Sequence, residues 1–351
     1  MNNKPLSAKA LSLLRELIAI PSISRDESRA ADFLQQYMES EGLETKRSGH
    51  NLWSITPAYD EHKPTLLLNA HIDTVKPVNG WRHDPFTPTM EDGKLFGLGS
   101  NDDGASVVCL LHVFLALHKA PLPYNLIFLS SCEEEVSGRG GIESVLPLLP
   151  HIDFAIVGEP TGLQPAIAEK GLMVLDVSYA GVSGHAARDE GENAIYKALD
   201  DIAWFRDYRF PKSSALLGPV KMSVTVIHAG TQHNVVPDRC TLTVDVRSNE
   251  CYTNREIYEE VCRHISGEAV ARSFRLGSSG VSPDHPMVKR AVALGLTPFG
   301  SPTLSDQALM PFPSMKIGPG QSSRSHTADE FVRPEELEAG IELYLKLLQT
   351  E

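Results

Sequence analysis

The sequence predicts an α/β protein: a mainly parallel sheet with helices on both faces, joined to an inserted α+β sandwich domain. Near-continuous apolar runs at Thr65–Ala70, Asn125–Ser130 and Phe154–Val157 alternate with helical stretches, which is typical of parallel strands buried on both faces. Between Gly171 and Leu276 the order becomes β-α-β-β-α-β, that of a split-βαβ sandwich. A length of 351 residues also suits two domains better than one.

The first part of the chain is expected to begin with two helices. Ser7 can cap the first helix, whose apolar residues follow helical spacing, and Pro21 ends it. Asp26 can open the second helix, which stops at Gly42. A third, apolar helix from about Ala105 to Leu117 is expected to cover the sheet.

The inserted segment and the end of the chain carry the remaining elements. In order, they are a strand at Leu172–Tyr179, a helix at Asn193–Phe205, strands at Val220–His228 and Arg239–Arg247, and helices at Asn254–Ile265, His285–Leu294 and Pro334–Leu348. A candidate ligand, His326, lies beyond the insertion. We therefore expect a discontinuous domain, 1–170 with 277–351, that is interrupted by a second domain at 171–276.

Composition excludes several classes of protein. The apolar share (42%) and charged share (22%) are those of a soluble globular enzyme. A net charge of −13 without a basic stripe argues against nucleic acid, and no apolar run is long enough for a bilayer. The start, Met1–Pro5, lacks the apolar core of a signal peptide, and the five cysteines lack CxxC spacing. We expect a cytoplasmic protein with reduced thiols.

Five short segments combine histidines and carboxylates. They are His71–Asp73, Gly99–Asp103, Glu133–Glu135, Gly158–Pro160 and Ser325–Glu330. Three of them come directly after apolar strand runs, and the carboxyl ends of parallel strands meet at one edge of a sheet. Imidazole and carboxylate without cysteine are the ligands of zinc, cobalt or manganese. The segments together predict a two-metal hydrolase site.

Taken singly, each segment also has an ordinary structural interpretation. Asp102 and Asp103 precede an apolar helix, so one of them can cap it while the other bridges two cations. Three consecutive glutamates are usually a solvated charge run, but Glu133–Glu135 follow a buried strand. His185 lies in a turn of small residues, a poor place for a core histidine. No catalytic role is expected for the histidines without acidic, ligand-like context: His50, His62, His83, His112, His118, His151, His228, His233, His264 and His285.

Over essentially the whole chain, these motifs resemble those of the di-zinc metallopeptidases that include acetylornithine deacetylase, succinyl-diaminopimelate desuccinylase, aminoacylase and carboxypeptidase G. The resemblance implies a role for each matched residue. It gives His71 and Glu159 to one metal, Glu135 and His326 to the other, Asp102 to both, the general-base role to Glu134, and the orientation of His71 to Asp73.

The resemblance also implies how substrate is bound. The inserted domain would act as a lid and form a homodimer, with His185 reaching the partner subunit's active site. Asn234 and Arg247 match positions that line the substrate pocket, and Gly318 lies in a substrate-facing turn. The chain departs from the family pattern twice: Asp103-Gly104-Ala105 replaces the usual residues after the bridging aspartate, and Glu133 replaces an aspartate.

The expected function is hydrolysis of the amide bond of a small N-acyl amino acid. Two divalent ions, zinc or alternatively cobalt, would activate the water. The resemblance favours an N-acetyl or N-succinyl derivative of ornithine, citrulline, diaminopimelate or lysine, as in arginine biosynthesis. The alternatives are a dipeptidase or aminopeptidase of the same family, or a non-catalytic metal-binding module. A cysteine or serine hydrolase is disfavoured, since Cys132 precedes the glutamates on a buried strand and Ser183 lacks a nucleophile-elbow motif.

Overall fold

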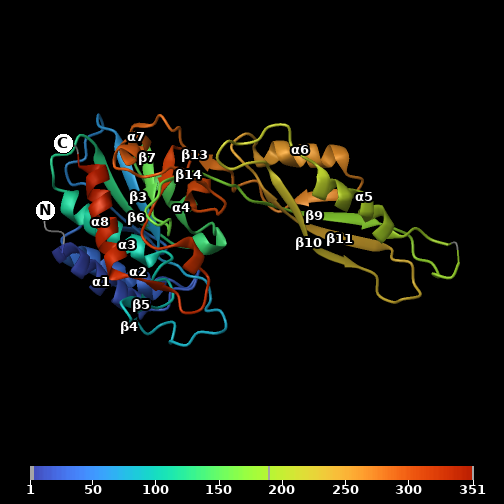
Figure 1. The fold of residues 1–351 in the computed structure, drawn as a ribbon, viewed down its shortest axis with the longest axis horizontal. Helices are drawn as coiled ribbons and strands as arrows, with labels where there is room; N and C mark the ends of the chain where they lie inside the picture. The colour runs from blue at the N-terminus through green and yellow to red at the C-terminus, as the bar shows by residue number, and fades with distance from the viewer. Residues whose placement is uncertain (1–3, 189, 350–351) are drawn as a thin grey trace. The chain divides into compact units, whose positions relative to one another are not determined.

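The structure is a computed structural model that describes residues 4–188 and 190–349 (Figure 1). The chain divides into two compact units. The first contains the described residues up to Ile167, Val281–Phe299 and the residues from Ser305 onward; the second contains Ala168–Gly280 and Gly300–Leu304. None of the helices in the described ranges is both long and apolar enough to cross a membrane.

The main sheet has a parallel centre and antiparallel flanks. Its order is β1 (Lys46–Ser48), β2 (Asn51–Ile55), β6 (Asn125–Ser131), β3 (Thr65–His71), β7 (Phe154–Val157), β15 (Ser314–Lys316), β8 (Ala166–Glu169) and β13 (Ser279–Gly280), with β14 (Phe299–Ser301) also pairing with β8. The strands β6, β3, β7 and β15 run parallel to one another. The pairs β1–β2, β2–β6, β15–β8 and β8–β13 are antiparallel. The predicted fold class is confirmed.

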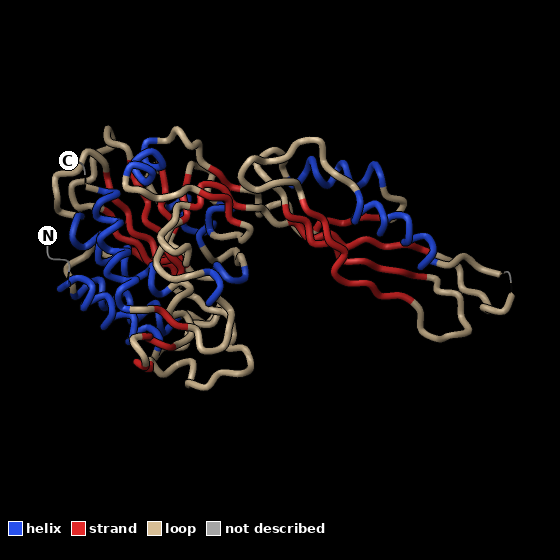
Figure 2. Tube along the Cα trace, in the orientation of Figure 1, coloured by secondary structure: helices blue, strands red, loops and turns tan. Residues whose placement is uncertain are grey.

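Both faces of this sheet are covered, as expected (Figure 2). Alternate side chains of β3 point to opposite faces: Leu66 and Leu68 join one apolar cluster, whereas Leu67 joins another. The first cluster includes residues of α1 (Lys4–Ile18), α2 (Ser28–Ser40), α3 (Gly104–Leu117), α7 (Pro286–Ala293) and α8 (Pro334–Leu348). The second cluster includes residues of α4 (Ile142–Val145), η2 (Leu146–Leu148) and η3 (Asp306–Leu309). A small separate sheet contains β16 (Phe331–Val332), β5 (Lys94–Phe96) and β4 (Thr89–Glu91).

Helix α3 is buried on nearly all sides, because it lies between the sheet and helices α1 and α8 (Figure 1). This explains why its sequence is apolar all round rather than along one stripe. The buried imidazole of His112 lies 2.9 Å from the Tyr37 hydroxyl and 2.7 Å from the Val108 carbonyl. His112 is therefore a hydrogen-bonded core histidine.

The predicted starts of the first two helices are wrong by a few residues. Helix α1 begins at Lys4, and Ser7 lies inside it, where its hydroxyl donates to the Lys4 carbonyl. Pro5 suits the first turn, since a proline there loses no helical hydrogen bond. Helix α2 begins at Ser28 rather than at Asp26. The φ of Arg25 is +76°, which is not helical, and the Glu27 carboxylate accepts the Arg25 N–H.

The second unit has the predicted β-α-β-β-α-β order. Its elements are β9 (Met173–Ala180), α5 (Ala194–Asp207), β10 (Lys221–Ala229), β11 (Arg239–Arg247), α6 (Asn254–His264) and β12 (Glu268–Ala271). The strands form an antiparallel sheet in the order β10-β11-β9-β12. Alternate residues of β11 are buried and pack with α5 and α6 in one core.

Replacing Leu111 by alanine should lower the free energy of unfolding by about 2–5 kcal/mol, because the side chain is fully buried within α3 and its loss leaves a cavity. Urea unfolding followed by circular dichroism at fixed metal content measures the change. The matched control is Leu148→Ala, since Leu148 is 56% exposed; it should stay within about 0.5 kcal/mol of wild type. Equal losses in the two variants would contradict this account of the core.

Candidate metal centre

The candidate ligands follow the carboxyl ends of neighbouring parallel strands. His71 is the last residue of β3 and pairs in register with Ser131 at the end of β6. Asn69 of β3 pairs with Val157, the last residue of β7. Because these parallel strands end within two residues of one another, His71 and the segments after β6 and β7 meet at one edge of the sheet.

Five side chains form two donor groups that share one aspartate. One nitrogen or oxygen from each of His71, Asp102 and Glu159 lies within 4.8 Å of the others, and the same holds for Asp102, Glu135 and His326. The two Asp102 oxygens face different imidazoles. Oδ1 lies 3.3 Å from Nε2 of His71, and Oδ2 lies 3.8 Å from Nε2 of His326. This is the arrangement in which one carboxylate can bridge two cations.

The residues present fit divalent cations. Nε2 of His71 is buried and has no hydrogen-bond partner, so a donor atom points into the cluster unpaired. Burial, and repulsion from other carboxylates, raise the pKa of Glu134 and Glu159 well above the ordinary value. Histidine nitrogens and carboxylate oxygens are the ligands that zinc, cobalt and manganese accept.

Asp73 holds two parts of the site together. Nδ1 of His71 lies 2.9 Å from the Asp73 backbone carbonyl but 3.5 Å from its carboxylate, so the backbone makes the shorter contact with the ring. The carboxylate accepts the N–H groups of Glu134 (3.0 Å) and Glu135 (3.1 Å) and the Ser24 hydroxyl (2.7 Å). Burial alone would raise the Asp73 pKa, but the nearby His71 imidazole and the hydrogen bond from the Ser24 hydroxyl hold it below its ordinary value.

Two further buried carboxylates, for which no role is predicted from the sequence, belong to the site. Glu330 accepts the N–H groups of Gly99, Asn101 and Asp102 at 2.8–3.1 Å and so fixes the turn that carries the shared aspartate. Burial raises its pKa to about 8. Asp306 accepts the Ser131 hydroxyl at 2.6 Å, and burial raises its pKa to about 6. Glu330 is the last residue of Ser325–Glu330, one of the five segments that combine histidines and carboxylates. No local sequence pattern points to Asp306.

Asp103 does not cap the helix that it precedes. It is the N-cap residue of α3, but its side chain makes no capping hydrogen bond. The side chain is buried, and burial raises its pKa to about 8. The Asp102–Asp103 peptide bond is cis. The expected division of labour, with one aspartate on the cations and the other capping the helix, is therefore not present.

Gly318 packs against a candidate metal ligand. A side chain at this position would place its Cβ 2.5 Å from the backbone oxygen of Glu159 and 2.6 Å from the Ser106 hydroxyl. The Gly318 N–H donates to the Thr161 hydroxyl at 3.1 Å. Glycine at this position therefore lets the segment after β15 approach the segment after β7.

The other predicted substrate-binding residues lie in the second unit, at two separate places. His185 forms an isolated bridge with Val235, and the neighbouring Ala186 N–H donates to the Asn234 carbonyl at 3.0 Å. Arg247 ends β11 and is held by Asp245 through two hydrogen bonds of 2.9 and 3.1 Å. His185 and Asn234 lie beyond the other end of β11, a strand of 9 residues that spans about 27 Å at strand spacing.

The fold and donor groups are those of a metal-dependent hydrolase, and comparison with known proteins gives the family. The profile of the Peptidase family M20/M25/M40 matches residues 67–350. The chain therefore belongs to this family, and it is a hydrolase of amide bonds.

Relatives of known name and structure agree with this assignment. The chain is 29% identical to the succinyl-diaminopimelate desuccinylase of Delftia acidovorans over 68% of each sequence. It is 27% identical to the acetylornithine deacetylase of Proteus mirabilis over 97% of this chain and 96% of the relative. A tripeptidase from Staphylococcus aureus has the same fold, with a TM-score of 0.76, 21% identity and 97% coverage of each chain.

Replacing Asp73 by asparagine should weaken metal binding by about 10–100-fold, as loss of a group that orients ligands typically does. The N–H groups of Glu134 and Glu135 donate to different oxygens of Asp73, and an amide replaces one of these oxygens by an NH₂ group that cannot accept. Competition with a chelator of known affinity measures the change. Asp284→Asn is the control, because that side chain is 87% exposed. Unchanged affinity in the Asp73 variant would show that Asp73 does not position the ligands.

Proposed function

We propose that the chain hydrolyses the amide bond of a small N-acyl amino acid, with two divalent cations, zinc in the first place, in the two donor groups. His71, Asp102 and Glu159 would hold one cation, and Asp102, Glu135 and His326 would hold the other. The observation that carries this proposal is the pair of donor groups sharing Asp102, whose two oxygens face different imidazoles.

When bound, such cations polarise the scissile carbonyl and lower the pKa of a water from 15.7 to about 7. At 1.36 kcal/mol per pKa unit, the shift corresponds to roughly 12 kcal/mol. A general base alone typically supplies about 10²–10⁴-fold in rate. The protein's main task is therefore to hold the donors in place and to move one proton.

Glu134 is the general base of this proposal. It belongs to neither donor group, yet its Oε2 lies 3.8 Å from Nε2 of His71. The buried Asp73 carboxylate accepts its backbone N–H at 3.0 Å, so the side chain projects from a fixed turn. Glu134 takes a proton from the attacking water and delivers it to the departing amine.

Arg247 is the proposed partner of the substrate's α-carboxylate. Its guanidinium fork already binds a carboxylate in two-pronged fashion, that of Asp245, which is the geometry that recognises a carboxylate. The side chain is 32% exposed, so an incoming anion can reach it. Binding of the substrate would replace or share the contact with Asp245.

His185 and Asn234 are proposed to serve the active site of a second copy of the chain. They flank one end of β11, whereas Arg247 lies at the other end. The chain enters and leaves the second unit near Arg247, since β9 begins and β12 ends at that end of the sheet. The two ends are about 27 Å apart, so one small pocket would receive both groups only from two subunits.

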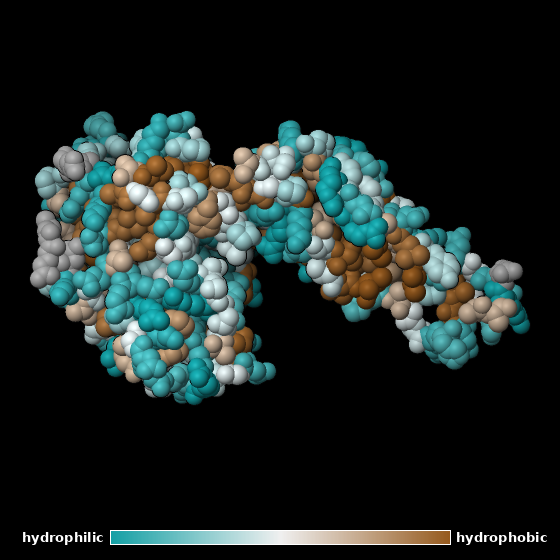
Figure 3. All heavy atoms as spheres, in the orientation of Figure 1, coloured by the Kyte–Doolittle hydropathy of each residue, from teal (hydrophilic) through white to brown (hydrophobic). Residues whose placement is uncertain are grey.

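The second unit also exposes large apolar side chains that suit such a homodimer. Tyr196 and Leu199 on α5 are 70% and 53% exposed, and Val226 and Ile227 on β10 are 40% and 50% exposed. Figure 3 shows apolar surface on the visible face of this unit. Exposed large apolar residues on neighbouring elements are typical of an interface between proteins.

The proposed substrates are N-acetyl or N-succinyl derivatives of ornithine, citrulline, diaminopimelate or lysine. Support comes from the relatives named as a desuccinylase and a deacetylase at 27–29% identity. A dipeptidase or aminopeptidase is the second candidate. Structural neighbours include proteins named as a tripeptidase and as human carnosine dipeptidase 1.

Replacing Glu134 by glutamine should lower kcat by about 10²–10⁴-fold and leave both cations bound, because the base is removed and the donor groups are intact. Zinc- or cobalt-loaded protein is assayed on the N-acyl amino acids named above and on dipeptides. We expect faster cleavage of the acyl amino acids by the wild type.

The matched control for this experiment is Glu335→Gln, which changes an exposed glutamate at the start of α8 and should keep full activity. Full turnover by a metal-loaded Glu134→Gln protein would remove Glu134 from the mechanism. Faster cleavage of dipeptides by the wild type would favour the peptidase alternative and leave the metal centre as proposed.

Mixing inactive Glu134→Gln and His185→Ala proteins should restore about a quarter of wild-type activity after random subunit exchange. Half of the dimers are then mixed, and each mixed dimer of a two-fold assembly has one site with both groups intact. Activity after verified exchange is the measurement. The control mixture, Glu134→Gln with Asp102→Asn, should show no rescue, since both residues serve the site of their own subunit and each site of a mixed dimer then lacks one of them. No rescue in the first mixture would place His185 in its own subunit's site or outside catalysis.

A further inference from the structure

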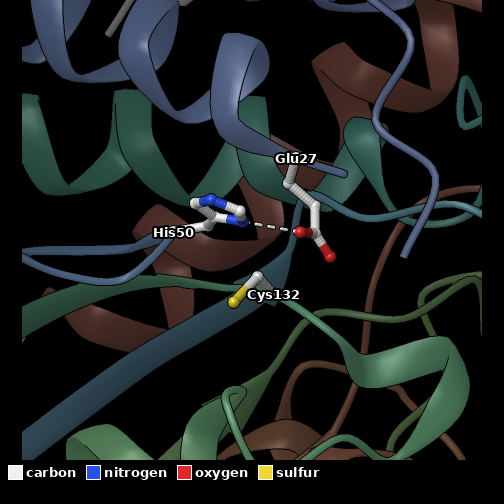
Figure 4. Close-up of side chains that lie close together, drawn as sticks. All are labelled: Glu27, His50 and Cys132. Atoms are coloured by element: carbon white, nitrogen blue, oxygen red, sulfur yellow. Dashed lines mark hydrogen bonds and ion pairs between the residues drawn. The ribbon is translucent and has the colours of Figure 1, made fainter. Parts of the chain in front are cut away.

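We propose that Glu27, His50 and Cys132 form a third cation site, suited to zinc or a similar ion. The three residues come from separate segments: Glu27 precedes α2, His50 lies between β1 and β2, and Cys132 follows β6. One donor atom from each lies within 4.8 Å of the others (Figure 4). His50 has no acidic residue beside it in the sequence, but the fold brings Oε2 of Glu27 to 2.7 Å from its Nδ1.

The donor set differs in kind from the two groups around Asp102, because it contains sulfur. Carboxylate, imidazole and thiolate together are a familiar set of zinc ligands. A tetrahedral zinc ion needs an N···O separation of about 3.3 Å and separations from sulfur of about 3.6 Å, given ordinary zinc–ligand lengths. To bind such an ion, Oε2 of Glu27 and Nδ1 of His50, now 2.7 Å apart, must move apart by a few tenths of an ångström. Any two donor atoms that are as much as 4.8 Å apart must approach each other by about 1 Å.

Three hydrogen bonds from backbone N–H groups hold Glu27 and Cys132 in place. Oε1 of Glu27 accepts the N–H groups of Arg25 (2.7 Å) and Glu133 (3.2 Å), while its Oε2 is directed at His50 (Figure 4). The Cys132 N–H donates to Oδ1 of Asn51, the residue after His50. The Cys132 thiol contacts the Gly140 carbonyl at 3.5 Å, a long contact that a metal–sulfur bond would replace at little cost.

Charge and burial favour a cation at this place. Glu27 is fully buried, Cys132 is 2% exposed, and the side chain of His50 is 29% exposed, which leaves a route from solvent. Burial, and next the carboxylates of Glu27, Asp73 and Glu133, raise the pKa of the Cys132 thiol, so these negative groups lie around it. The guanidinium of Arg25 lies 4.0 Å from Glu133 but is 70% exposed. A divalent ion would offset the charge of the carboxylate and the thiolate that bind it.

Binding of Co²⁺ distinguishes the proposed third site from the two donor groups around Asp102 by absorption spectroscopy. The donor groups around Asp102 hold no sulfur, so a thiolate-to-cobalt charge-transfer band in the near ultraviolet reports a cysteine ligand alone. Metal-free full-length protein is titrated with Co²⁺, and bound metal is counted per chain. We expect three ions and a near-ultraviolet band that grows with the third.

Cys132→Ser should abolish the band and lower the count to two, with the visible cobalt bands of the catalytic groups retained as proof of folding. Cys109→Ser is the matched control, since Cys109 is also buried and also contacts a carbonyl at 3.5 Å; it should keep the band. His50→Gln, a change at a partly exposed residue, should weaken binding of the third ion at least tenfold.

Absence of the band in saturated wild-type protein, or its survival in Cys132→Ser, would overturn the third site. Unchanged affinity for the third ion in His50→Gln would do the same, because the site needs all three donors. Each of these outcomes is independent of turnover, so a failure here is distinguishable from a failure of the proposed hydrolase activity.

Discussion

The metal centre depends on the shared register of β6, β3 and β7. Because His71 pairs with Ser131 and Asn69 with Val157, the three strands deliver Glu134, Glu135 and Glu159 to one place together with His71. Two unit charges 4 Å apart repel each other by about 4 kcal/mol at an effective dielectric constant of 20. The carboxylates would separate if they stood on flexible loops. The hydrogen bonds of the sheet prevent this, and cations bound at this place would offset the repulsion.

Buried carboxylates outside the donor groups fix the turns that carry the ligands. Asp73 accepts two N–H groups of the glutamate turn, Glu330 accepts three from the Gly99–Asp102 turn, and Glu27 accepts the Glu133 N–H. Hydrogen bonds to an ionised carboxylate, such as Asp73 with its lowered pKa, are stronger than neutral ones and direct the backbone. A layer of carboxylates therefore lies around the donor groups, and Cys132 lies next to this layer.

The sequence predicts the elements whose pattern is strong and local. The range of β11 and that of α8 match their expected ranges because strand alternation and helical spacing continue to the last residue. The donors around Asp102 could also be predicted, since each lies beside a strand end or a glycine turn. The role of Asp306 could not be predicted, because its partner Ser131 lies 175 positions away in the chain. The same is true of Glu27 and His50, since Cys132 lies 105 positions from Glu27. Long-range contacts of this kind have no local pattern.

On the proposed function, metal chemistry and substrate choice belong to different units of the chain. The cation donors and Glu134 all lie in the first unit, within a sheet whose centre is parallel and buried. Arg247, Asn234 and His185 lie in the second unit, on an antiparallel sheet that has its own core. Each unit buries its own apolar cluster, so residues that contact the acyl group or the amino acid can change without disturbing the donors. This separation gives a physical reason why relatives named for different substrates share one fold.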